Sequence, residues 1–340
     1  MEILSKDRYG EFEEFCSSHP HGAFQQSPRW GNVKTEWDNE VIVSRDADGN
    51  IKGGMFVLIR KLGLKSMMYA NRGPVCDYTD RETIEDLLRG VKALAKKHRA
   101  FRFIMDPLVK ADDRDTIALF RSCGLSLKEN AGFHDTIQPR TNYMLDYIKG
   151  YTEDQLLAKM NSGTRYYIRY PYKHGVECKN VGLDGLDDFY TIYAETGERQ
   201  HFSIRPREYF VKMLTALGDD CRLYMCYFEG KPLCGGVRVQ YRGTTSHVYG
   251  CSTDEMRKLY PTYRLQWELM KWALEGGCHT YDMQGVATKP EDSEELYRIL
   301  RFKSHFSGAV IETAGEFTIT FDPIYAKSID VALEVRRKLK

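Results

Sequence analysis

The sequence predicts a mixed α/β protein of the α+β class, built from two domains that share one order of elements. The chain has 340 residues, which is too long for one ordinary hydrophobic core and suits two domains. Short β-branched runs alternate with amphipathic helical patterns in both halves. The order hairpin, strand, helix, strand, helix, strand occurs once in each half, so the second half repeats the secondary-structure order of the first.

In the first half, the Asp48-Gly49 pair between apolar runs predicts a hairpin turn. Apolar residues that follow at a spacing of three and four predict an amphipathic helix beginning near Ile84 and ending near Ala95. The strands are expected at 40–45, 51–60, 65–75, 101–105 and 142–147, with a further helix at 115–123.

The second half follows two linking helices and repeats the same order of elements. Helices are expected at 152–160, 162–170, 186–200, 206–217, 261–275 and 293–302. Strands are expected at 221–228, 233–241, 246–251, 279–286 and 309–321. This alternation differs from that of a doubly wound nucleotide-binding sheet.

Charge and cysteine usage exclude several classes of protein. The 49 Lys and Arg residues nearly cancel the 48 Asp and Glu residues, giving a net charge of +1, so a strongly basic nucleic-acid-binding protein is not indicated. The sequence shows no run approaching the roughly 18 apolar residues of a membrane helix and no signal-peptide core, which predicts a cytoplasmic protein. The nine cysteines form no CxxC pair and predict reduced thiols; we expect no metal site and no cofactor.

Eight short segments occur together along nearly the whole chain. They include Gln26-Ser27-Pro28-Arg29-Trp30, Tyr69-Ala70-Asn71-Arg72-Gly73-Pro74-Val75 and Tyr281-Asp282-Met283-Gln284-Gly285-Val286. The other five lie at 136–140, 162–169, 204–210, 261–268 and 300–306. In this order they resemble the Fem family of peptidoglycan-bridge aminoacyltransferases, the FemA, FemB, FemX and MurM group. The absence of a long heptad run makes the compact FemX-like type the better match.

The resemblance implies two tandem domains of the GNAT (acyl-CoA N-acyltransferase) fold. The expected boundaries are 1–148 for the first domain, with the C-terminal segment 316–340 returning to it, and 149–315 for the second. It also implies transfer of an amino acid from aminoacyl-tRNA to a side-chain amine in the stem peptide of a peptidoglycan precursor. UDP-MurNAc-pentapeptide and lipid II both remain open as acceptors, and peripheral membrane association is compatible with either. A monomer is expected.

Lys303 is the residue expected to carry the chemistry. It ends a predicted helix in Arg301-Phe302-Lys303 and matches a family lysine that stabilises developing negative charge. A fixed ammonium performs this task well in a site shielded from water. The alternative interpretation is a solvated lysine that interacts with the helix dipole.

The other expected precursor contacts come from both halves of the chain. Lys34 and Arg205 match the pair that holds the precursor's diphosphate in FemX-like members, and two cations from separate segments suit such a group. Tyr209 lies one helical turn beyond Arg205, and Tyr249 matches a further substrate-contacting tyrosine. Each of the two tyrosines is equally well interpreted as a core aromatic. Asp106 matches a substrate-contacting position, but a turn or capping role is an equal alternative.

A basic stripe on the predicted linking helix is the candidate contact for tRNA. Arg165, Arg169 and Lys173 are spaced by four residues, so they lie on one helical face and can meet a phosphate backbone. The alternative is an ordinary solvated face, with Tyr166, Tyr167 and Ile168 turned inward to pack.

Two rival functions follow from the same sequence. The GNAT fold also suits an acyl-CoA-dependent N-acetyltransferase, which presents a glycine-rich pyrophosphate loop before a helix. The corresponding stretch at 252–260 contains no glycine, and Pro74 removes a donor from the equivalent turn of the first half. The second rival is a non-catalytic protein that binds the precursor or tRNA, against which the presence of Lys34, Arg205 and Lys303 argues.

Overall fold

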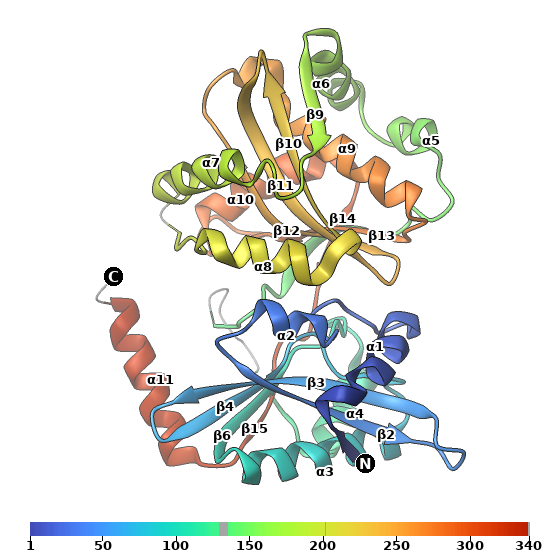
Figure 1. The fold of residues 1–340 in the computed structure, drawn as a ribbon, viewed down its shortest axis with the longest axis vertical. Helices are drawn as coiled ribbons and strands as arrows, with labels where there is room; N and C mark the ends of the chain where they lie inside the picture. The colour runs from blue at the N-terminus through green and yellow to red at the C-terminus, as the bar shows by residue number, and fades with distance from the viewer. Residues whose placement is uncertain (129–134, 201, 339–340) are drawn as a thin grey trace. The chain divides into compact units, whose positions relative to one another are not determined.

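The computed structural model describes residues 1–128, 135–200 and 202–338, and it divides the chain into two compact units. Unit 1 comprises Met1–Gln138 and Thr313–Lys340, and unit 2 comprises Pro139–Glu312. The structure therefore moves the domain boundary from 148 to 138 and begins the returning segment at 313 instead of 316. Both units are mixed α/β, each with one central sheet covered by helices (Figure 1).

Unit 1 contains an eight-stranded sheet in the order β1-β2-β3-β4-β6-β15-β7, with β5 paired to β3. Every neighbouring pair is antiparallel except β4 and β6, which are parallel. The strands are β1 (Glu2–Leu4), β2 (Asp38–Arg45), β3 (Ile51–Leu62), β4 (Lys65–Ala70), β5 (Val75–Cys76), β6 (Ala100–Met105), β7 (Ser126–Leu127) and β15 (Phe317–Thr320).

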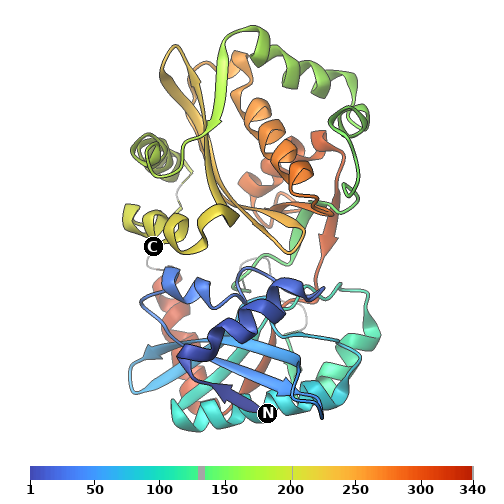
Figure 2. The same ribbon diagram turned by 45° about the vertical axis from the view of Figure 1, so that its right-hand side comes forward.

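Helix α3 covers one face of this sheet, and α1 with α2 covers the other (Figures 1 and 2). The Asp80 side chain caps α3 by accepting a hydrogen bond from the Thr83 amide. The apolar face of α3, from Ile84 to Leu94, is buried in the core, as its spacing predicts. The helices of unit 1 are α1 (Tyr9–Ser18), α2 (Arg29–Val33), α3 (Arg81–Lys97), α4 (Arg114–Ser122) and α11 (Pro323–Lys338).

Unit 2 contains a seven-stranded sheet in the order β14-β8-β13-β12-β11-β10-β9. Only β12 and β13 are parallel. The strands are β8 (Thr141–Leu145), β9 (Val176–Asn180), β10 (Cys221–Phe228), β11 (Lys231–Tyr241), β12 (Thr244–Ser252), β13 (Thr280–Gly285) and β14 (Ala309–Glu312).

Helices α9 and α10 lie on one face of this second sheet, and α7 and α8 lie on the other (Figure 2). The helices of unit 2 are α5 (Glu153–Ala158), α6 (Ser162–Lys173), α7 (Leu186–Arg199), α8 (Arg207–Leu217), α9 (Pro261–Glu275) and α10 (Glu294–Lys303). None of the helices in the described part of the chain is long and apolar enough to cross a bilayer.

The two units share a core motif in which a three-stranded meander leads through a helix to a parallel strand. In unit 1 this motif is β2-β3-β4-α3-β6, and in unit 2 it is β10-β11-β12-α9-β13. The predicted repeat is therefore confirmed from the hairpin to the strand that follows the helix, but not for its last strand. The parallel pair lies near the middle of each sheet, where a crossover helix can connect its two strands.

In each unit, a strand that is distant in the sequence lies beside the parallel pair: β15 beside β6 in unit 1, and β8 beside β13 in unit 2. The predicted strand at 309–321 is two strands: β14 joins the sheet of unit 2, and β15 joins the sheet of unit 1. The strand predicted to complete the first half is β8, which pairs with β13 and β14 of unit 2. These partners explain why the domain boundary lies before β8.

Candidate functional site

Lys303 is a buried lysine at the C-terminal end of α10. Its side chain is only 7% exposed, and Nζ donates hydrogen bonds to the carbonyl oxygens of Gln284 at 3.0 Å and Gly285 at 2.8 Å. This position excludes the alternative of a solvated lysine. The helix ends at this residue, as predicted, but the burial depends on β13, which supplies both carbonyl groups.

The carbonyl groups that receive Lys303 are held in place by Asp282. Gln284 has a positive φ of 63°, which is uncommon for a residue other than glycine. The Asp282 carboxylate accepts hydrogen bonds from the Gln284 amide at 2.7 Å and from its side-chain nitrogen at 2.5 Å. The segment Tyr281-Asp282-Met283-Gln284-Gly285 therefore builds the seat of the lysine.

Two further polar residues, not predicted from the sequence, lie close to this seat. Arg238 on β11 is fully buried, and its Nη1 donates to the carbonyl oxygens of Val237 and Tyr249, each at 3.1 Å. Its Nε and Nη2 lack a hydrogen-bond partner among the described residues, as does the buried Nδ1 of His247 on β12. Arg238 and His247 are directly paired across the two strands. Arg238 stands out because its charge is buried. The residue pattern of one strand does not reveal such burial.

A glycine pair makes room for these two side chains. Gly236 on β11 lies opposite Gly250 on β12. A Cβ atom at Gly236 would lie 2.7 Å from Nη1 of Arg238, and a Cβ at Gly250 would lie 2.9 Å from Nε2 of His247. Any larger residue at these positions would displace the arginine or the histidine.

Burial and the neighbouring charges together set the pKa of Lys303. Burial lowers the pKa of Lys303 to about 7; the nearby Asp282 carboxylate opposes this shift, and Arg238 adds to it. Burial also lowers the pKa of His247, with Arg238 and Lys303 acting in the same direction. The imidazole is therefore neutral at physiological pH. The site holds two buried basic side chains beside one buried carboxylate.

This geometry leaves Lys303 with one donor for a ligand. An ammonium has three N–H groups, and the carbonyls of Gln284 and Gly285 take two of them. A positioned donor of this kind, in a site from which water is largely excluded, can stabilise an oxyanion.

Arg205, Tyr209 and Tyr249 lie together. The Arg205 guanidinium lies over the Tyr209 ring at 5.5 Å from its centroid, and the Tyr209 and Tyr249 rings meet edge to face at 6.0 Å. Arg205 precedes α8 and is exposed, whereas Tyr209 is only 7% exposed. Because Arg238 donates to the Tyr249 carbonyl, this cluster continues into the polar residues around Lys303.

The two candidate residues of unit 1 have different environments. Lys34 follows α2 as its C-cap residue, and its ammonium lies 5.2 Å from the Trp30 ring centroid. Asp106 follows β6 and is only 2% exposed. Its Oδ2 accepts from the Tyr69 hydroxyl at 2.5 Å and its Oδ1 from the Arg72 amide at 2.6 Å. Burial raises the pKa of Asp106, while Arg72 opposes that shift.

Asp106 therefore has a structural task in unit 1, which supports the turn alternative. It fixes Arg72, whose φ of 60° places it in the left-handed region. Gln26 completes this segment: its side-chain nitrogen donates to the carbonyls of Phe56 and Asn71, and its oxygen accepts from the Phe56 amide. The segments around Gln26 and Arg72, which carry the family resemblance, are thus tied to each other.

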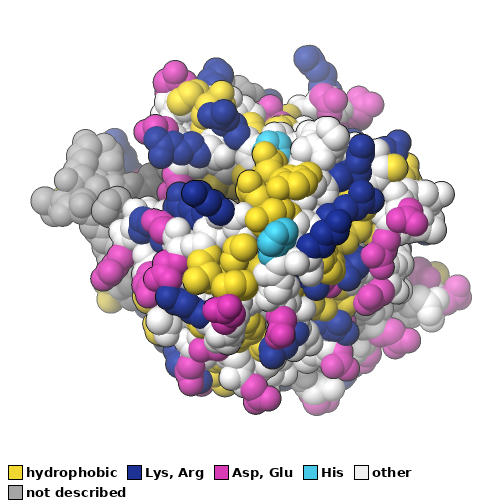
Figure 3. All heavy atoms as spheres, turned by 90° about the horizontal axis from the view of Figure 1, so that it is seen from above, with side chains coloured by type: hydrophobic (Ala, Val, Ile, Leu, Met, Phe, Trp, Pro, Cys, Tyr) yellow, Lys and Arg dark blue, Asp and Glu magenta, His cyan; other side chains and the backbone are white. Residues whose placement is uncertain are grey.

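Helix α6 presents the basic stripe together with exposed tyrosines. Arg169 and Lys173 are exposed, while Arg165 is half-buried and donates to the Met160 carbonyl. Ile168 is buried, whereas Tyr166 is 54% exposed, so the alternative of inward packing does not hold for Tyr166. Figure 3 views the molecule from the end of unit 2 where α6 lies. It shows hydrophobic and tyrosine side chains (yellow) bordered by Lys and Arg side chains (dark blue).

The tyrosines of α6 begin a series of aromatic contacts that reaches α10. Tyr167 lies 4.5 Å from Tyr260 and 5.1 Å from Tyr263 between ring centroids. Tyr263 in turn lies 5.1 Å from Phe302, the residue before Lys303, and its hydroxyl is 2.6 Å from Nδ1 of His305. His305 is therefore a structural partner of this series.

Comparison with known families and proteins extends over the whole chain. A family model described as the FemAB family matches residues 7–231 and 229–333. The chain is 32% identical over 327 residues to UDP-N-acetylmuramoylpentapeptide-lysine N(6)-alanyltransferase of Weissella viridescens, covering 94% of this chain and 95% of that protein. It is 26% identical over 416 aligned positions to lipid II:glycine glycyltransferase of Staphylococcus aureus, covering 97% of each.

Solved structures show the same fold. The crystal structure of FemX matches with a TM-score of 0.86 at 24% identity, covering 96% of this chain and 99% of that chain. A tandem GNAT protein from the clavulanic acid biosynthesis pathway matches with a TM-score of 0.56 at 9% identity, covering 94% and 98%. These similarities confirm the prediction of two tandem GNAT-like domains.

Proposed function

The chain belongs to the FemAB family, and from that premise we propose that it is an aminoacyltransferase that adds an amino acid to a peptidoglycan precursor. The alanyltransferase and the glycyltransferase that it resembles are named for such transfers. The donor in this proposal is aminoacyl-tRNA, and the acceptor is a side-chain amine of the stem peptide in UDP-MurNAc-pentapeptide or lipid II. The observation that carries the proposal is the buried seat of Lys303.

The chemistry needs little from the enzyme beyond placement and charge stabilisation. The aminoacyl ester is already activated, so attack by a neutral amine produces a tetrahedral oxyanion. Its collapse forms the amide and breaks the ester bond, and the proton that the amine loses is taken up by the leaving tRNA oxygen. Lys303 donates its remaining N–H to that oxyanion. The pKa of about 7 allows a substantial fraction of Lys303 to remain charged near neutral pH.

The candidate precursor contacts in this proposal are cations and tyrosines. Arg205 binds the diphosphate through its bidentate fork, and Lys34 is carried over as a second candidate cation for this group. Tyr209 orients Arg205 through their cation–π contact, and Tyr249 extends the same surface. Asp106 acts on the precursor by holding the backbone at Arg72, and no proton transfer is assigned to it.

The tRNA contact in this proposal lies on α6. Exposed aromatic rings beside Lys and Arg suit single-stranded nucleic acid, because bases stack on the rings while the cations meet phosphates. Arg165, Arg169 and Lys173 supply the charge. The contacts from Tyr167 through Tyr263 to Phe302 lead from this surface to the residue beside Lys303, which is where an aminoacylated 3′ end has to arrive.

A charge-reversal experiment tests the α6 assignment. Arg169→Glu with Lys173→Glu should raise KM for aminoacyl-tRNA about tenfold or more and leave KM for the precursor unchanged. The matched control is Lys92→Glu with Arg114→Glu, two exposed positions of unit 1. Equal KM values for tRNA in both double variants would remove α6 from the donor site.

The function itself is tested by a transfer assay with a mixed pool of charged tRNAs, offering UDP-MurNAc-pentapeptide and lipid II in separate reactions. Incorporation of a labelled amino acid into one acceptor is the expected result, and the productive tRNA identifies the amino acid. Transfer only from an acyl-CoA would instead support the N-acetyltransferase. Precursor binding without transfer from any charged tRNA would support the non-catalytic protein.

We place the reaction in the cytoplasm, since charged tRNA is an intracellular donor. The monomer expected from the sequence is carried into this proposal. Sedimentation of the purified protein at assay concentration tests it, and a dimer that dissociates with loss of transfer would overturn it.

A further inference from the structure

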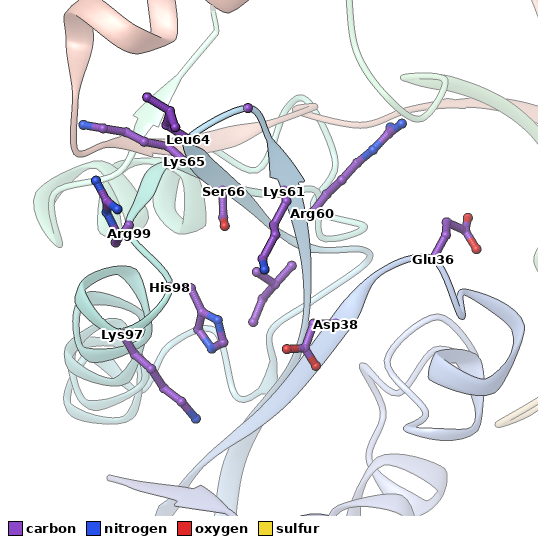
Figure 4. Close-up of a pocket in the computed structure, with 12 residues that line it drawn as sticks. Glu36, Asp38, Arg60, Lys61, Leu64, Lys65, Ser66, Lys97, His98 and Arg99 are labelled. Atoms are coloured by element: carbon purple, nitrogen blue, oxygen red, sulfur yellow. The ribbon is translucent and has the colours of Figure 1, made fainter.

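Unit 1 contains a cavity that none of the candidate site residues lines. It has a volume of about 810 Å³ and lies between the β3–β4 hairpin, the start of β2 and the end of α3 (Figure 4). Lys61 and His98 point toward each other across it, with the Asp38 carboxylate beside them, and Leu64 marks the hairpin turn (Figure 4). Its size is that of a cleft for a small ligand or a lipid headgroup.

The lining of this cavity is predominantly basic. Five lysines and arginines face two carboxylates, Glu36 and Asp38; the basic residues are Arg60, Lys61, Lys65, Lys97 and Arg99. Lys97 pairs with Glu40 at 2.6 Å, and Lys65 pairs with Asp322. Among the described residues no ion pair is recorded for Lys61 or Arg99, so these two cations are available to an anionic ligand.

One exposed aliphatic side chain lines this cavity, and a second lies at the start of α11, which is hydrogen-bonded to the same hairpin. Leu64 at the hairpin turn is 80% exposed, and Ile324 in the first turn of α11 is 86% exposed, the two highest values among the large hydrophobic residues described. Both belong to rigidly joined segments. The Tyr325 hydroxyl accepts from the Leu64 amide at 3.1 Å and donates to the Leu62 carbonyl at 2.5 Å.

The apolar surface continues along α11. Val331 and Val335 follow Ile324 at intervals of seven and eleven residues, which places the three on one helical face, and the two valines are 52% and 51% exposed. Lys327, also exposed, lies close to this face. Aliphatic side chains next to cations are typical of proteins that lie on the interface of an anionic bilayer.

We propose that the β3–β4 hairpin and α11 form a docking surface for a bilayer containing anionic phospholipids. Leu64 and Ile324 enter the interfacial region, while Lys61 and Arg99 meet lipid phosphates at the mouth of the cavity. Charge complementarity selects this occupant, because a neutral protein surface would leave the two cations without partners. A nucleic acid is disfavoured, because the exposed groups here are aliphatic and offer no stacking surface.

This surface stands independently of the proposed function, since no candidate precursor or tRNA residue belongs to it. Vesicle sedimentation of the full chain tests it, with vesicles of phosphatidylcholine alone and vesicles enriched in phosphatidylglycerol. We expect binding to the anionic vesicles only, weakened by salt. Leu64→Ser with Ile324→Ser should weaken it about tenfold, which corresponds to about 1.4 kcal/mol. Lys61→Glu with Arg99→Glu should weaken it by a similar factor.

Matched control variants distinguish binding through this surface from nonspecific binding to vesicles. Leu183→Ser removes an aliphatic side chain that is 46% exposed in unit 2, and Lys92→Glu with Arg114→Glu changes the same net charge elsewhere in unit 1. Both should bind vesicles like the wild type, and all variants should keep wild-type circular dichroism and wild-type transfer to a soluble acceptor. Absence of wild-type binding, or equal loss in the control and test variants, would overturn the proposal. Loss in the charge variant alone would refute insertion of Leu64 and Ile324.

Discussion

Substitution of Lys303 by methionine should separate stability from chemistry, because the lysine is a buried cation. Methionine keeps most of the side-chain volume and removes the charge. Lys303 is 7% exposed, and burial lowers its pKa to about 7 from an ordinary value of 10.5. The folded protein therefore releases a proton at Lys303 near neutral pH, whereas the unfolded chain keeps it.

The sign of the pH dependence follows from this difference. Below about pH 7 both states hold the proton, and the folded state bears the full cost of a buried ammonium. Between about pH 7 and 10.5 the unfolded state binds more protons, so the stability contributed by this residue rises with pH. For a folded pKa of about 7, the gain between about pH 6 and about pH 9 is about 3 kcal/mol.

Urea unfolding of the wild type and of Lys303→Met at the two pH values measures this gain. The difference between the two unfolding free energies should change by about 3 kcal/mol, with the wild type relatively more stable at the higher pH. Lys92→Met, at an exposed lysine of α3, is the control and should show no such change. A difference that stays constant across this range would refute the buried-cation argument.

The same variant should lose activity without losing its fold. Turnover should fall at least tenfold, because a donor aimed at an oxyanion contributes about that much or more, while precursor affinity changes little. Wild-type turnover in Lys303→Met would remove this residue from the chemistry, whatever the stability data show.

Three further predictions follow from the contacts around the candidate residues. Arg238→Met removes a cation that lowers the pKa of Lys303, so the decline of turnover at high pH should move to higher pH; an unchanged pH–rate profile would contradict this. Arg205→Ala should raise KM for the precursor about tenfold at constant kcat, and a fall in kcat alone would count against diphosphate binding. Asp106→Asn leaves one of the two donors, Tyr69 or the Arg72 amide, without an acceptor and should lower the unfolding free energy by about 1 to 3 kcal/mol; an unaltered melting temperature would show that the Asp106 contacts are dispensable.

The local spacing of apolar and turn residues is enough to predict many of the helices and hairpins of the fold. The spacing around Ile84 and Leu94 predicts α3 because a period of 3.6 residues identifies a buried helical face. The hairpins β2–β3 and β10–β11 appear at the expected turns, since the turn residues and β-branched runs act within a few positions. The short N-terminal elements and β9 were not predicted, because they lack a clear period of their own.

Strand partners and buried charges required the three-dimensional arrangement. A run such as 309–321 carries no mark that divides it between two sheets, because the pairing of β14 and β15 depends on residues more than 160 positions away in one case and at least 190 in another. Likewise, the sequence alone gives Arg238 as an ordinary strand residue. Its burial depends on the space left by Gly236, which lies opposite a glycine of β12.

The candidate site divides in the same way. Helical spacing placed Lys303 at the end of a helix and aligned Arg165, Arg169 and Lys173 on one face, because helical geometry acts over a few residues. Arg205 lies before the start of α8, so its contact with Tyr209 is not a contact within one helix. The burial of Lys303, its two carbonyl partners and the charges that shift its pKa come from β11, β12 and β13. Desolvation depends on every element packed around a group, so no local pattern contains it.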